Sequence, residues 1–127
     1  MIGYVTLGTN DMEKSAAFYD ALLAEIGASR FMEMETFIAW ATNPKLPALS
    51  ITKPFDGGEA SVGNGVMIAL TVDSNDKVDS FYAKAMELGA TDEGAPGPRG
   101  DTGFYAGYFR DLDGNKLNVF CMTQPEG

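Results

Sequence analysis

Residues 4–28, YVTLGTNDMEKSAAFYDALLAEIGA, set a pattern that residues 67–90, MIALTVDSNDKVDSFYAKAMELGA, repeat. When 63 is subtracted from the second set of numbers, the Phe-Tyr pair at 81–82 falls on the pair at 18–19. A repeat of roughly 60 residues indicates two copies of one supersecondary unit. We therefore expect neither copy to close a core alone.

Each copy begins with a strand, predicted over 2–8 and 65–72, and continues with an amphipathic helix. Three short extended runs follow each helix: 31–35, 37–41 and 48–53 in the first copy, and 91–94, 104–110 and 116–122 in the second. The sequence therefore predicts an α+β protein built from two βαβββ repeats.

Local signals mark the ends of both helices. Asn10 and Asp73 are the predicted N-caps, and Gly27 and Gly89 stand where a left-handed residue ends a helix. We interpret the Phe-Tyr pair of each helix as core packing rather than a ligand-stacking site.

Domain organisation follows from the repeat. We predict one domain over 1–127, with the first repeat at about 1–54, a linker at 55–64 and the second repeat at about 65–123. Residues 54–65, PFDGGEASVGNG, which include this linker, are rich in turn-forming residues.

Composition excludes several classes of function. The 127 residues carry 9 basic and 18 acidic side chains, a net charge of −9, which argues against binding nucleic acid or an anionic membrane. Histidine is absent and Cys121 is the one cysteine, which excludes a Ser-His-Asp triad and a thiolate zinc site. With no leader or spanning segment visible, a lone cysteine is typical of the reducing cytoplasm, where we expect the protein to act.

The second copy ends on a specific motif. Residues 109–117, FRDLDGNKL, resemble the FRDPDGNxLE ending of the vicinal oxygen chelate superfamily, with Leu112 where proline is common. Residues 5–7, 11–15 and 94–99 resemble the same family. Its members include glyoxalase I, the bleomycin-resistance proteins and the extradiol dioxygenases. The resemblance implies eight strands curled into two half-barrels around a cup, and a homodimer.

The resemblance also places the metal ligands of the family, usually histidine and glutamate. The four positions fall on Tyr4, Ser50, Met67 and Asn118 in this sequence. A phenol, a hydroxyl, a thioether and an amide supply no fixed negative charge to a divalent ion. We therefore predict that the family's metal site is absent and that the protein holds no cofactor.

A small, partly aromatic or amphipathic ligand is the expected occupant of the cup, because strand residues two apart share a face. The alternative is a filled interior. The predicted binding residues are Tyr4, Thr6, Trp40, Ser50, Met67, Arg99, Tyr108, Asn118 and Phe120.

Arg99 lies in a Gly- and Pro-rich segment, 94–103, that we expect to form a loop over the cup. Its guanidinium is suited to holding a carboxylate or phosphate, and the alternative is a surface pair with Asp101. Glu33 and Glu35 are a solvated strand face, the acid and base of a hydrolase, or relocated metal ligands.

Three functions remain open from the sequence. The first is a metal-free protein that binds a small organic molecule. The second is a glyoxalase-like or dioxygenase-like metalloenzyme with relocated ligands, such as Glu33 or Glu35. The third is an accessory dimer module without catalysis. The residues leave open whether any reaction is catalysed.

Overall fold

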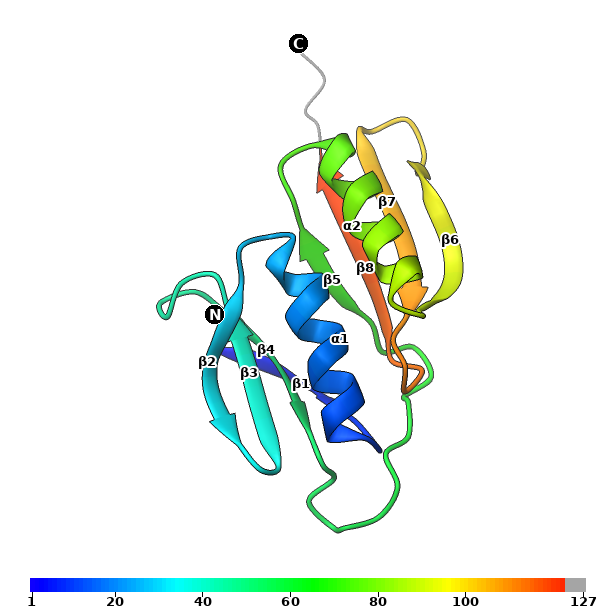
Figure 1. Cartoon of the computed structure of the whole chain (residues 1–127). Coiled ribbons are helices and arrows are strands. Elements are labelled where there is room, and N and C mark those ends of the chain that lie inside the picture. Colours follow the sequence, from blue (N-terminus) through cyan, green and yellow to red (C-terminus); the bar gives the residue numbers. More distant parts are fainter. Residues whose placement is uncertain (123–127) are drawn as a thin grey trace. The chain divides into compact units, whose positions relative to one another are not determined.

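The computed structural model describes residues 1–122 and divides into two compact units, Met1–Gly63 and Asn64–Gly127. Each unit consists of a strand, a helix and three further strands (Figure 1), so the predicted α+β fold with two βαβββ repeats is confirmed. The elements are β1 (Tyr4–Gly8), α1 (Met12–Ala24), β2 (Ser29–Met34), β3 (Phe37–Ala41), β4 (Ala48–Thr52), β5 (Ile68–Thr71), α2 (Asn75–Glu87), β6 (Thr91–Pro98), β7 (Phe104–Arg110) and β8 (Lys116–Met122).

The sheet of the first unit has the order β1-β4-β3-β2, with β1 parallel to β4 and the other pairs antiparallel. One face of this sheet packs on α1. Tyr19 and Leu22 of the helix and Trp40 and Ile51 of the sheet are all buried there. The apolar stripe that the sequence predicted for the helix therefore forms the core of this unit.

The second unit repeats this arrangement with the order β5-β8-β7-β6. Figure 1 shows α2 lying over β7 and β8. Val78, Phe81 and Ala85 of α2 are buried, as are Phe109 and Leu117 of the sheet. Phe18, Tyr19 and Phe81 of the two Phe-Tyr pairs are buried in the cores, as predicted. Tyr82 is only half-buried, and its hydroxyl donates to Asp92.

Both predicted N-caps are wrong by one residue. Asp11 caps α1 by accepting a hydrogen bond from the Lys14 amide at 3.1 Å, and Ser74 caps α2 through the Lys77 amide at 3.2 Å. The Asn10 side chain instead bonds the backbone of Ala60, whose N–H donates to Asn10 Oδ1 at 2.7 Å. Asn10 is therefore engaged in a tertiary contact with Ala60, and the adjacent residue Asp11 caps the helix instead.

The predicted helix ends are confirmed. Gly27 and Gly89 have φ angles of +77° and +100°, the left-handed region that glycine adopts at low cost.

The largest difference from the predicted strands is in β6, which continues to Pro98. Its register shifts between Asp92 and Gly94 and again between Gly94 and Gly97. Because β6 lies at the edge of the sheet, these bulges accommodate its prolines. Half of the predicted loop at 94–103, residues 94–98, is thus strand.

Neither helix within residues 1–122 has the length and apolar character needed to cross a membrane.

Candidate functional site

In each unit, the sheet has one face toward its helix and one face away from it, which we call the open face. On the open face of the first unit, Thr6 of β1 lies opposite Ser50 of β4, and Tyr4 lies two residues before Thr6. The two hydroxyl oxygens are 2.9 Å apart, and the Ser50 hydroxyl donates to the carbonyl of Val5 at 2.7 Å. Both hydroxyls therefore already have partners inside the protein.

The same face carries an apolar pocket of about 300 Å³. The Tyr4 ring contacts the Phe37 ring edge-on at 6.1 Å between centroids, and Tyr4 is 63% exposed. The pocket is lined by Tyr4, Phe31, Met32, Met34, Phe37 and Ala39. Of these six residues, only Tyr4 is among the predicted binding residues.

Trp40 does not join this face, which corrects its predicted place beside Tyr4, Thr6 and Ser50. Ala39 is the residue of β3 that lies opposite Ser50, and Trp40 is therefore on the helix face. The indole is 1% exposed and lies 5.7 Å from the Tyr19 ring, and its N–H donates to Asp20 Oδ1 at 2.8 Å. Trp40 is a core residue with a satisfied polar atom.

The open face of the second unit gathers several predicted residues. Tyr108 of β7 lies opposite Asn118 of β8, and the alternation of β8 places Phe120 and Lys116 on the same face. Asn118 is 2% exposed, and its Oδ1 has no hydrogen-bond partner among the described residues. A buried amide oxygen without a partner is costly, so this atom is suited to meeting a ligand.

Arg99 lies over this face. Its guanidinium carbon is 5.4 Å from the centre of the Tyr108 ring. The group donates to the carbonyls of Gly97 at 2.9 Å and Ala95 at 2.8 Å, which fix its position. A Cβ at Gly94 or Gly97 would lie 3.3 Å from the guanidinium nitrogens, so the two glycines leave the space that it fills.

The alternative of an Arg99–Asp101 pair is not what the structure shows. Among residues 1–122, Arg99 has no carboxylate within ion-pair distance. The Lys116 ammonium lies 5.7 Å from the Tyr108 ring and has no carboxylate partner there either. Lys116 is absent from the predicted binding residues, although its spacing from Asn118 already placed it on this face.

Met67 lies just before β5 and is 38% exposed. Phe104 and Phe120 of the second unit form a stacked aromatic pair, with ring centroids 5.5 Å apart.

The four positions that the family resemblance assigns to metal ligands do not suit a divalent ion. Ser50 is engaged with Val5 and Thr6, and Asn118 is a neutral amide. Tyr4 and Met67 supply a phenol and a thioether. None of these groups carries the fixed negative charge or imidazole nitrogen that such an ion needs.

Relocated carboxylates find no support in the arrangement of acidic side chains. Glu33 forms an ion pair with Arg30 at 2.7 Å, and Glu35 lies in the turn between β2 and β3. No three His, Cys, Asp or Glu side chains within the described range are grouped so that they could hold a metal ion.

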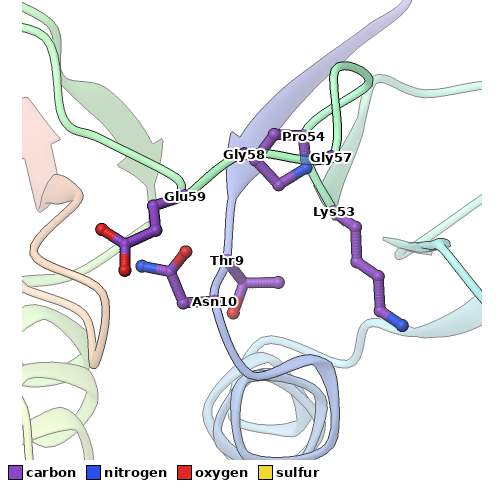
Figure 2. Close-up of a pocket in the computed structure, with 7 residues that line it drawn as sticks. All are labelled: Thr9, Asn10, Lys53, Pro54, Gly57, Gly58 and Glu59. Carbon is purple, nitrogen blue, oxygen red and sulfur yellow. The ribbon is translucent and has the colours of Figure 1, made fainter.

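A second pocket, of about 500 Å³, lies between the start of α1 and the loop after β4. Figure 2 shows Lys53 and Glu59 on opposite sides of it, with Thr9 and Asn10 between them. The Thr9 hydroxyl is bonded to the backbone of Asp11, and the Asn10 amide to Ala60. These polar groups therefore stabilise the loop conformation. This pocket was not predicted from the sequence.

The tyrosines with perturbed pKa values are on the helix side of the second unit. Burial and a hydrogen bond to Asp92, at 2.6 Å, raise the pKa of Tyr82 to about 12. A hydrogen bond to Asp79 raises the pKa of Tyr105. Both bonds join α2 to the sheet, so they indicate structural roles rather than an acid–base site.

Comparisons with known proteins agree with this fold. The family model of the glyoxalase/bleomycin resistance protein/dioxygenase superfamily matches residues 1–119. A glyoxalase/bleomycin resistance protein from Albidiferax ferrireducens T118 is 33% identical, with a TM-score of 0.88 over 97% of this chain and 99% of that one. A search of curated proteins finds no match.

More distant solved structures share the fold alone. The fosfomycin resistance protein FosX from Listeria monocytogenes is 18% identical, with a TM-score of 0.74 over 97% of this chain and 93% of that one. Lactoylglutathione lyase from Agrobacterium tumefaciens is also 18% identical, with a TM-score of 0.68 over 94% of this chain and 92% of that one.

Proposed function

Because this chain belongs to the glyoxalase/bleomycin resistance protein/dioxygenase superfamily, we propose that it binds a small organic ligand without a divalent metal ion. The buried side chain of Asn118 is the main observation in favour of this proposal. Among residues 1–122, its buried amide oxygen has no hydrogen-bond partner on the open face of the second unit. Tyr108 lies opposite Asn118, and two cations lie against the Tyr108 ring. A buried polar atom that costs folding energy without an internal hydrogen bond is typical of a binding site.

The donor set supports the metal-free part of the proposal. An ion at the family's position would have to exchange water for a phenol, a thioether and neutral oxygens. Such ligands do not offset the loss of hydration of a dication.

The decisive variant is Asn118→Leu, which keeps the size of the side chain and removes both polar atoms. We expect the free energy of unfolding to rise by about 1–2 kcal/mol, because a buried unpaired amide disappears. Ligand binding should weaken at the same time. An amide with a purely structural role would give the opposite sign in the unfolding experiment.

Binding is tested with metal-free protein, prepared with a chelator, against a panel of neutral and charged aromatic and aliphatic compounds. We expect at least one class to raise the melting temperature and to shift the NMR signals of Tyr108 and Asn118. Stoichiometric metal in the purified protein, or binding that requires added metal, would contradict the proposal. An inert panel would instead favour the accessory module.

We also propose a homodimer, on the strength of the family resemblance. The exposed side chains of Tyr4 and Met34 on the open face of the first unit support it, because apolar patches often lie in interfaces. Sedimentation equilibrium tests the dimer directly.

A further inference from the structure

The half-buried cations of the chain fall into two groups. Arg30, Lys84 and Arg110 each have a carboxylate partner: Arg30 pairs with Asp20 and Glu33, Lys84 with Glu87, and Arg110 with Glu93. Arg99 and Lys116 have none within residues 1–122, and both lie against Tyr108. The two unneutralised, partly buried cations are thus on one face of one unit.

A partly buried cation loses hydration that an anion would offset. The Tyr108 ring provides part of that compensation through its π face, yet no side chain among residues 1–122 supplies the negative charge. The protein as a whole is strongly acidic, with a net charge of −9, and repels anions in general. An anion that binds here therefore depends on Arg99 and Lys116.

Arg99 is held ready for such a partner. Its hydrogen bonds to the carbonyls of Ala95 and Gly97 are internal to its own strand and hairpin, and they leave its charge intact. The fixed guanidinium would lose little side-chain entropy on binding, which favours affinity. The glycines at 94 and 97 provide the space for this conformation.

An apolar surface adjoins the cations on the same face. Phe120 is two residues beyond Asn118 on β8, a separation of about 7 Å along a strand. The ring of Phe120 stacks on Phe104, and both are partly exposed. A charged region and an aromatic region therefore lie within the length of one small molecule.

We infer that the open face of the second unit binds an organic acid, with its carboxylate near Arg99 and Lys116 and its apolar body on Phe104 and Phe120. This inference rests on the proposed function and names its ligand class. A carboxylate only accepts hydrogen bonds, so it can take one from the Asn118 N–H, while the buried Oδ1 of Asn118 needs a donor elsewhere on the ligand.

The test compares cinnamate with cinnamamide, which have the same shape and differ in charge, by calorimetric or NMR titration of the intact protein. We expect cinnamate to bind at least about tenfold more tightly, as for a charge-assisted pair. Added salt should weaken the binding of cinnamate but not that of cinnamamide. Acetate and inorganic phosphate should both bind at least about tenfold more weakly than cinnamate, because they lack the apolar body.

Arg99→Gln and Lys116→Gln should each remove most of the preference for cinnamate over cinnamamide. Lys45→Gln is the matched control, because it makes the same change of charge at an exposed residue of the first unit. Lys116 has no hydrogen bond among the described contacts, so its substitution tests the site even where Arg99→Gln disturbs the hairpin.

Equal binding of the acid and the amide would overturn the organic-acid assignment and leave the proposed function standing. An equal loss of cinnamate binding in Lys45→Gln would also overturn it, because the effect would then be general electrostatics. Absence of binding by either probe overturns the assignment, whereas the proposed function fails only when the whole panel is inert.

Discussion

The two units share one order of elements and differ on their open faces. In the first unit this face is apolar, with Phe31, Met34 and Phe37 around a pocket, and its hydroxyls are bonded to one another or to the backbone. In the second unit it carries Arg99 and Lys116, which have no carboxylate partner in the described part of the chain, residues 1–122. The helix faces therefore maintain the fold in both units, while the side chains of the open faces can differ in polarity and charge without disturbing it.

The helix faces show how closely the two folds correspond. Trp40 packs on Tyr19 with ring centroids 5.7 Å apart, and Phe109 packs on Phe81 at 6.2 Å, both at an interplanar angle of 43°. One aromatic residue of the third strand therefore fixes the helix in each unit. Trp40 adds a hydrogen bond to Asp20.

The largest expected effect on stability comes from truncating these two aromatic side chains. Trp40→Ala and Phe109→Ala should each lower the free energy of unfolding by about 3–5 kcal/mol, because both side chains are fully buried. Urea unfolding measures the loss. Trp40→Phe keeps most of the packing and loses the bond to Asp20, so it should cost clearly less.

A small effect of Phe109→Ala beside a large effect of Trp40→Ala would break the correspondence between the helix faces. It would mean that the second unit relies on its tyrosine–carboxylate bonds rather than on this aromatic contact.

Much of the fold could be read from the sequence, and the main error at the site has a simple cause. The offset of 68 residues that matches Ser50 to Asn118 is supported by register, because Thr6 and Ala69 lie opposite them in β1 and β5. In the third strand of each unit the offset is 69, since Ala39 and Tyr108 lie opposite Ser50 and Asn118. An error of one residue in this offset moves a side chain to the opposite face of the strand. For this reason Trp40 was predicted to lie beside the ligand, whereas it lies on the helix face.

Other features depend on contacts between residues far apart in the sequence, which local sequence patterns do not predict. Asn10 and Asp11 are both good N-caps, and the contact with Ala60 decides between them. The pairing of β6 with β7 could not be predicted from its proline- and glycine-rich sequence. The position of Arg99 over Tyr108 follows from that pairing.

The turns before the last strand of each unit offer a sharper comparison. Asp111 is 4% exposed and accepts hydrogen bonds from the amides of Asp113 and Asn115, both at 2.9 Å. In the first unit, Asn43 accepts one from the Lys45 amide at an exposed site. Asp111→Ala should therefore cost about 2–3 kcal/mol and Asn43→Ala less than about 1 kcal/mol, measured by urea unfolding. Equal costs would show that the buried carboxylate does not stabilise its turn.

The glycines that end the helices should behave alike. A Cβ at Gly27 would meet no atom within 4 Å, and one at Gly89 would meet only the end of Leu112 at 3.4 Å. Alanine at either position should cost about 1–2 kcal/mol, because the cost is that of a left-handed residue. A much larger loss for Gly89→Ala in thermal unfolding would indicate that Leu112 cannot move aside.

The smallest effects on stability are expected from changes of pH, one at acidic pH and one at alkaline pH. The Arg30 guanidinium and the Trp40 N–H hold the pKa of Asp20 below its usual range, so this contribution is present above pH 3.8 and is lost as pH falls. The pKa of Tyr82 is raised to about 12, so its contribution is present below pH 10.0 and is lost as pH rises toward 12. Unfolding curves across pH should show that Asp20→Asn flattens the acid limb and Tyr82→Phe the alkaline limb. Because both groups are partly exposed, solvent screening keeps each change small. The Tyr82 hydroxyl also lowers the pKa of Asp92, so Tyr82→Phe should change the acid limb slightly as well. A change of the alkaline limb in Asp20→Asn would disprove the assignment of that limb to Tyr82.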